Sequence, residues 1–147
     1  MQSQYVPPKC TSCFSLIKDE VIGLLQFDGT PIEKNWHGFR SECGVLSGRE
    51  YVVVRPETGT ENGKWALKTE YFGAFPSLEV ALLHRGFHVA HIKTKTRWCL
   101  DEDTEAQAEF ADFLHQKLGL SETCVPIGMS CGGMQGIYLA GKHPEKV

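Results

Sequence analysis

The sequence predicts an α/β protein with a mostly parallel sheet, an N-terminal antiparallel hairpin, and helices on both faces of the sheet. Three observations support this. Strand-like and helix-like segments alternate from Lys64 onward, the preceding segment has the pattern of a β-hairpin, and Gly86 and Gly119 end the helical patterns. Strands joined through helices need right-handed crossovers, which make them parallel in a sheet covered on both faces.

The predicted hairpin is the segment 41–56, SECGVLSGREYVVVRP, with its turn at Ser47-Gly48. The second strand contains three consecutive valines, and β-branched residues favour extended structure. The polar, glycine-rich loop ETGTENG follows. Beyond it, Trp65, Leu67 and Thr69 alternate with Ala66, Lys68 and Glu70, which predicts a half-buried strand.

The first predicted helix begins at Pro76-Ser77, with Ser77 as N-cap, and ends at Gly86 as a left-handed stop. Glu79 in its first turn suits the helix dipole. Its expected inward face is formed by Leu78, Ala81, Leu82 and the stem of Arg85. The apolar segment 87–93, FHVAHIK, predicts the next strand.

The second predicted helix begins with a capping box formed by Thr104 and Gln107, and Gly119 ends it. Its apolar residues keep helical spacing: Ala106, Phe110, Phe113, Leu114 and Leu118. The acidic run DEDTE from Asp101 lacks the spacing of a calcium loop, so we interpret it as a solvated, dipole-matched helix start.

The last predicted strand is CVPIG, residues 124–128, and the segment 131–142 favours a helix that ends at His143-Pro144. Pro126 fits poorly in a central strand because proline has no N–H to donate. We expect residues 1–35 to form an N-terminal extension. Residues 36–147 then form the N-terminal part of one domain.

Composition limits the classes of function. The 147 residues are 41% hydrophobic and 22% charged with a net charge of −3, so the basic excess of nucleic-acid-binding proteins is missing. The sequence has neither a secretory leader nor an apolar run near the ~18–20 residues of a membrane helix. We therefore expect a cytoplasmic protein with a small-molecule substrate and no nucleic-acid or membrane partner. Its oligomeric state is not predicted.

Six cysteines are too few for a disulfide scaffold, which agrees with a reducing compartment. Cys10 and Cys13 have C-x-x-C spacing, which suits zinc or redox chemistry when a second pair or a thioredoxin-like strand and helix accompanies it. Neither accompanies this pair, so two free thiols are the simpler interpretation.

The segment Gly128-Met129-Ser130-Cys131-Gly132 is a G-x-S-x-G motif between a predicted strand and a predicted helix. In that context the serine hydroxyl projects above the sheet, the glycines relieve crowding, and the next backbone N–H faces a developing oxyanion. A phosphate-binding turn at a helix N-terminus is the alternative. A thiol nucleophile at Cys131 is disfavoured because the motif uses the amide of that position.

Several segments together resemble α/β-hydrolases of the esterase or prolyl-oligopeptidase-like (peptidase S9-like) group. The residues that carry the resemblance lie between Trp36 and Val147: W-H-G-F, the F-G at 72–73, A-L-L-x-x-G-F-H-V, G-M-S-x-G-G and the final H-P-E-K-V. This resemblance implies a serine hydrolase that cleaves a carboxylic ester or a peptide bond through an acyl-enzyme, without cofactor or metal.

The resemblance assigns roles to individual positions. Ser130 is the expected nucleophile, and the backbone N–H of Cys131 is one oxyanion donor. The second donor is expected from Tyr71 or Phe72, in a loop that lacks the H-G-G-G run of many lipases. Gly128 and Gly132 are the glycines of the elbow.

Histidines give no clear metal site. His88 and His91 are three residues apart on a predicted strand and so face opposite sides, while His84 belongs to the preceding helix. His37 and His115 have no partner that the sequence identifies. We expect all five to be packing or surface residues.

A catalytic serine needs a histidine base and a carboxylate, which follow the serine in this family's chain order. After Ser130 come only His143 and Glu145, and His143 lies a helix length, roughly 20 Å, from the serine. We therefore expect an incomplete chain that is inactive alone and stops after the helix that follows the elbow. The alternative is a non-catalytic protein that keeps the fold to bind a ligand or partner.

Overall fold

Strand β5 (His88–Ile92) joins the two parts of a mixed sheet in the computed structural model, which describes residues 31–147. On one side lie β3 (Arg49–Val54), β2 (Phe39–Leu46) and β1 (Ile32–Trp36), and on the other lie β4 (Trp65–Lys68) and β6 (Val125–Ile127). Three helices, α3 (Ser77–Leu83), α4 (Asp101–Leu118) and α5 (Cys131–Lys142), pack against this sheet, and a short 3-10 turn, η2 (Pro144–Lys146), follows.

The predicted mostly parallel sheet is wrong. The pairs β1–β2, β2–β3 and β3–β5 are antiparallel, and only β4–β5 and β4–β6 are parallel. The crossover rule applies to strands joined through a helix, which here are β4, β5 and β6. The earlier strands are joined by turns and a loop, and β5 inserts between β3 and β4, antiparallel to β3.

Two tight turns build the antiparallel part. His37 and Gly38 connect β1 to β2 with φ of 50° and 92°, and Ser47 and Gly48 connect β2 to β3 with φ of 48° and 77°. Two consecutive positive φ values match the right-handed twist of a hairpin. The second hairpin was predicted, whereas β1 was not recognised as a strand.

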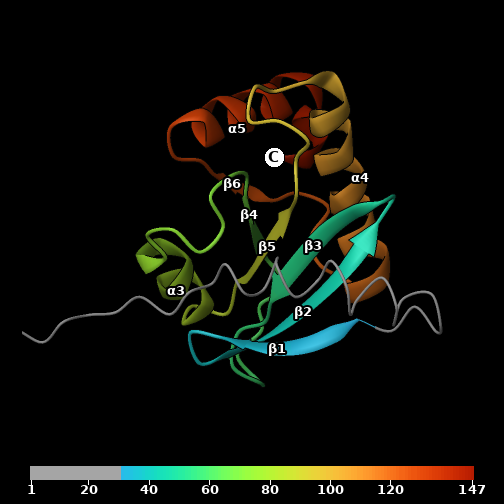
Figure 1. The fold of residues 1–147 in the computed structure, drawn as a ribbon. Coiled ribbons are helices and arrows are strands. Elements are labelled where there is room, and N and C mark those ends of the chain that lie inside the picture. The colour runs from blue at the N-terminus through green and yellow to red at the C-terminus, as the bar shows by residue number, and fades with distance from the viewer. Residues whose placement is uncertain (1–30) are drawn as a thin grey trace, which may run out of the picture.

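The helices cover the two faces of the sheet (Figure 1). Helices α4 and α5 pack on one face over Trp65, Leu67 and Ala90, where Phe110 and Leu114 are fully buried. Helix α3 covers the other face through Leu83, next to Val52, Val54 and Val89. The sheet is thus covered by apolar packing on both faces, and the candidate site lies where β6 ends and α5 begins.

Helix α3 differs from its prediction. Ser77 is its first residue rather than its cap, because Pro76 occupies the N-cap position and no side chain caps the helix. The buried residues are Glu79 and Leu83, and Leu82 packs partly against the same core as predicted, whereas Leu78 is 53% exposed. The helix is rotated because Glu79 forms a buried ion pair with Lys68. Gly86 has the predicted left-handed conformation, with φ of 84°.

Helix α4 begins three residues before the predicted capping box, at Asp101, with Leu100 as N-cap and no side-chain cap. Thr104 and Gln107 are therefore interior residues, and both are buried. Asp103 is also buried and bonds to Arg49, so the acidic run is only partly a solvated helix start. Gly119 ends the helix with φ of 66°, as predicted.

The predictions for Cys10 and Cys13 lie outside the described residues. Strand β1 begins within the predicted extension, residues 1–35, and the domain boundary itself stays a prediction. In the part of the chain that the structure describes, no helix combines the length and the apolar character needed to cross a membrane.

Candidate functional site

Ser130 lies in the turn between β6 and α5, and its backbone is in an unusual conformation. Its φ is 55° and its ψ is −125°, a combination that non-glycine residues rarely adopt. Such strain costs about 1–3 kcal/mol and persists where the surrounding structure imposes it. The side chain is exposed. The turn therefore holds a serine hydroxyl in solvent at the start of a helix.

Gly128 and Gly132 make this turn sterically possible. A Cβ at Gly128 would lie 2.3 Å from the carbonyl oxygen of Gly132, a distance that real Cβ atoms do not reach. A Cβ at Gly132 would lie 3.0 Å from Thr69 Oγ1 and 3.1 Å from Glu70 Cβ. The two predicted elbow glycines are thus positions where backbone segments approach each other closely.

Thr69 fastens the end of β4 to the start of α5. Its hydroxyl donates to the carbonyl oxygen of Gly132 at 2.7 Å and approaches that of Ile127 at 3.2 Å. Its backbone N–H also donates to the Ile127 carbonyl, at 3.1 Å. The loop that follows β4 is therefore held next to the turn that carries Ser130.

A network of polar side chains also connects the loop after β4 to α5. Glu70 Oε2 accepts hydrogen bonds from Gln135 Nε2 at 2.9 Å and from Thr94 Oγ1 at 3.1 Å. Gln135 Oε1 in turn accepts from Gln107 Nε2 at 3.3 Å. Sequence reasoning missed these residues. The available signal was a glutamine in the middle of an otherwise apolar or small-residue helix.

Tyr71 contacts the residue that follows the serine. Cys131 Sγ donates to Tyr71 Oη at 3.2 Å, so the thiol faces the tyrosine ring rather than the Ser130 side of the turn. The hydrogen bond with Cys131 raises the pKa of the Tyr71 hydroxyl. Tyr71 itself has φ of 55°, a second strained residue beside Ser130.

Two backbone N–H groups near Ser130 are not used within the fold. Within residues 31–147, the backbone N–H groups of Cys131 and Tyr71 have no hydrogen-bond acceptor. Phe72 packs its ring against His91 and Trp36, with ring centroids 5.6 Å and 5.3 Å away. The choice between the backbone N–H groups of Tyr71 and Phe72 for the second donor stays a prediction.

None of the six histidines, all of which lie in the described part of the chain, forms a hydrogen bond with Ser130. His91 is buried beneath Phe72, and its Nδ1 lies 2.7 Å from the carbonyl oxygen of Lys68. Burial lowers the pKa of His91. His88 is buried too, and burial likewise lowers its pKa.

The other histidines belong to turns and surfaces. His37 is in the first hairpin turn, His84 lies 4.0 Å from a Glu57 carboxylate, and His115 Nδ1 is 2.7 Å from the Leu120 carbonyl oxygen. Among residues 31–147, His, Cys, Asp and Glu side chains form no group of three that could hold a metal ion.

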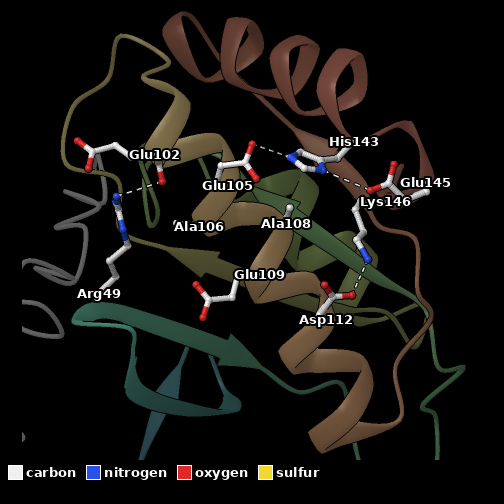
Figure 2. A pocket seen from close by; sticks show the side chains of 10 residues that line it. All are labelled: Arg49, Glu102, Glu105, Ala106, Ala108, Glu109, Asp112, His143, Glu145 and Lys146. Carbon is white, nitrogen blue, oxygen red and sulfur yellow. Dashed lines mark hydrogen bonds and ion pairs between the residues drawn. The ribbon is translucent and has the colours of Figure 1, made fainter.

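His143 follows the far end of α5. Because His143 lies 13 residues after Ser130, a rise of ~1.5 Å per residue along α5 separates the two by roughly 20 Å. Its Nε2 lies 3.0 Å from Glu105 and its Nδ1 lies 3.3 Å from Glu145, so this histidine links α4 to η2 (Figure 2). The predicted separation of His143 from the serine agrees with this geometry.

The pocket in Figure 2 has a volume of about 670 Å³ and is distant from the serine. Most of its lining side chains are charged, and some of them pair with each other, such as Lys146 with Asp112. Two smaller pockets are lined by residues next to the Ser130 turn, one by Glu70 and Tyr71 and the other by Glu70. The Ser130 motif and this pocket thus lie at opposite ends of α5.

Comparison with known proteins identifies a similar fold but no family. Neither a protein-family model nor a curated protein matches the chain. Among solved structures, the chain is similar to a cold-adapted esterase from an Arctic intertidal metagenomic library, solved with zinc bound. The match has a TM-score of 0.54 and 16% identity, and it covers 80% of this chain and 60% of the esterase chain. The two chains share a fold.

Proposed function

We propose that the chain carries the nucleophile of a serine hydrolase, and that Ser130 attacks a carboxylic ester. The observation that supports this most directly is the positive φ of Ser130, φ 55° with ψ −125°, at an exposed strand-to-helix turn. A non-glycine residue in that conformation is a strained position, and strain of this kind concentrates at functional sites. The shared fold with an esterase supports the same reaction class.

In the proposed reaction, Ser130 Oγ forms a bond to the ester carbonyl carbon while its proton passes to a base. The carbonyl oxygen becomes an oxyanion, for which the N–H groups of Cys131 and Tyr71 are the proposed donors. The C–O bond to the alcohol then breaks, the alcohol takes the proton, and an acyl-enzyme remains. Water hydrolyses that acyl group in a second, equivalent step.

The base is the component that the described residues do not supply. None of the histidines, all within residues 31–147, forms a hydrogen bond with Ser130, and an unassisted serine hydroxyl is a weak nucleophile. This observation favours a second candidate function, in which the fold binds a ligand or partner and Ser130 performs no chemistry.

A chemical-rescue experiment separates the two functions. Hydrolysis of 4-nitrophenyl acetate and labelling by a fluorophosphonate would be measured with and without added imidazole, which can act as the missing base. We expect imidazole to accelerate both reactions in the unmodified chain beyond its effect in buffer. Ser130→Ala should abolish the acceleration, whereas Ser77→Ala, at an exposed serine on α3, should leave it intact.

A further variant tests the role of the neighbouring thiol. Cys131→Ala keeps the backbone N–H, so labelling should persist if the amide of this position is what matters. Labelling that disappears in Cys131→Ala but survives in Ser130→Ala would assign the nucleophile to the thiol and contradict the proposal. Equal labelling of the unmodified chain and Ser130→Ala would favour the non-catalytic function.

A further inference from the structure

The loop after β5 carries three cations at alternate positions, Lys93, Lys95 and Arg97. This loop is fixed by Asp103 of α4, whose carboxylate accepts the backbone N–H of Lys95 at 2.7 Å and that of Thr96 at 3.1 Å. Asp103 is itself buried and paired with Arg49 at 2.6 Å. A loop held from beneath by a buried carboxylate presents its outward side chains in a defined position.

Arg97 differs from the two lysines in its partners. Lys93 pairs with Glu50 at 3.1 Å and Lys95 with Glu102 at 2.5 Å. Arg97 forms no ion pair with any of the described residues 31–147, and its guanidinium carbon lies 5.7 Å from the ring centroid of Tyr71. It is an exposed cation held against an aromatic face.

The contacts of Tyr71 connect Arg97 to the candidate nucleophile. Arg97 lies over the ring, and Oη of the same ring lies 3.2 Å from the sulfur of Cys131, the residue after Ser130. Only one aromatic side chain therefore separates the guanidinium from the start of α5. A substrate that extends from Ser130 along the Tyr71 ring would meet this cation.

A pocket of about 350 Å³ lies beside the Arg97 guanidinium. This volume is within the range of ~300–1,000 Å³ that is typical of small-molecule sites. Its lining residues are Glu70, Thr94, Lys95, Thr96, Arg97 and Trp98. Trp98 is 70% exposed and offers an apolar surface next to the charge. Glu70 already uses Oε2 for Thr94 and Gln135, and it forms no ion pair with Arg97.

We propose that Arg97 binds a carboxylate on the substrate of Ser130, so that the preferred esters are monoesters of dicarboxylic acids or similar anionic esters. This inference rests on the proposed function of Ser130. A guanidinium matches a carboxylate through two parallel hydrogen bonds. The pocket contains one cation without an ion-pair partner, Arg97, and also the Glu70 carboxylate. This balance of charge favours a ligand with a single negative charge over a phosphate dianion.

The test measures binding rather than turnover, using Ser130→Ala so that the ester is not consumed. Methyl hydrogen glutarate, dimethyl glutarate and inorganic phosphate would be titrated by calorimetry and by tryptophan fluorescence. We expect the monoester to bind more tightly than the diester and phosphate. Arg97→Gln should weaken monoester binding by about tenfold or more, the usual range for hydrogen bonds to charged groups.

Two further variants complete the test. Arg85→Gln is the matched control, since Arg85 is also exposed and also forms no ion pair within the described residues, but lies after α3. It should leave binding unchanged, and Arg97→Lys should restore part of it. Equal affinity for monoester and diester, tighter phosphate binding, or no effect of Arg97→Gln would overturn the inference. Arg97-dependent binding together with an unreactive Ser130 would instead keep the anion site and reject the proposed hydrolase.

Discussion

Lys68 at the end of β4 and Glu79 in the first turn of α3 form an ion pair that is almost entirely buried, with 4% and 3% of their side chains exposed. The second carboxylate oxygen, Oε2 of Glu79, has no hydrogen-bond partner among residues 31–147. Desolvating two charges is expensive, so neither residue tolerates loss of the other. The pair explains why α3 turns a glutamate toward the sheet and leaves Leu78 in solvent.

Glu79→Ala should therefore lower the free energy of unfolding by about 3–5 kcal/mol, because it leaves the Lys68 ammonium buried without its partner. Urea denaturation measures this loss. The matched control on the same helix is Leu78→Ala, which should stay within about 0.5 kcal/mol because the side chain is exposed. A larger effect for Leu78 than for Glu79 would mean that the helix is rotated as the apolar pattern alone predicted.

Gly128→Ala should destabilise the protein by about 1–3 kcal/mol, since the new methyl group would overlap the backbone of Gly132. It should also reduce fluorophosphonate labelling, because the turn around Ser130 must shift. Gly141→Ala, in the helix α5 that follows the turn, provides the control. Its Cβ would meet nothing within 4 Å, so we expect a gain of about 0.5–1 kcal/mol. Thermal and urea denaturation of both variants measure these changes in stability. Equal changes for the two variants would contradict the close contact between Gly128 and the Gly132 backbone.

Thr69→Val removes the hydroxyl that joins β4 to α5 but keeps the shape of the side chain. A buried carbonyl that loses its donor costs about 1–3 kcal/mol, and we expect a loss in that range with slower labelling of Ser130. Thr69→Ser should retain most of the stability because it keeps the donor. Thr123→Val, at an exposed threonine, is the control. If the Val and Ser variants of Thr69 behave alike, the hydrogen bond to Gly132 contributes little.

The link between α4 and η2 should depend on pH. Hydrogen bonds and charge from Glu105, then Glu145, raise the pKa of His143 above the ordinary value of 6.5. The folded state thus binds the proton more tightly than the unfolded state. The stabilisation is fully present below about pH 6.5 and is lost as the pH rises through the raised pKa.

Comparing urea midpoints of the unmodified chain and His143→Asn between pH 5.5 and 8.5 measures this effect. The difference in stability should shrink as the pH rises. Glu105→Gln, which removes the partner with the largest effect, should flatten the pH dependence. A difference that grows with pH would contradict the protonated link.

The sequence analysis succeeded where the signal is local. The turn at Ser47-Gly48, the left-handed Gly86 and Gly119, and the crowding at Gly128 and Gly132 all follow from conformations that one or two residues must adopt. Strand direction is not local, because β5 lies next to β3 only after the chain has passed through β4 and α3. The local pattern therefore predicted where strands form, but not which strands pair or in which direction.

Buried polar residues were missed for a related reason. Glu79, Gln107 and Gln135 look like surface positions in a helical pattern. Their burial depends on partners distant in the sequence, such as Lys68 for Glu79 and Glu70 for Gln135. The serine motif was found because its spacing is short, whereas the network that holds its turn involves four separate elements.

The insertion of β5 between β3 and β4 has a kinetic consequence. Until His88–Ile92 has been synthesised and has entered the sheet, β3 and β4 have no common neighbour and each exposes an unpaired edge. The two halves of the sheet therefore cannot form independently of each other. The chain loses the entropy of closing long loops before the stabilising contacts between strands form. Folding of this chain should be slow and sensitive to concentration, because exposed strand edges associate between molecules before β5 covers them.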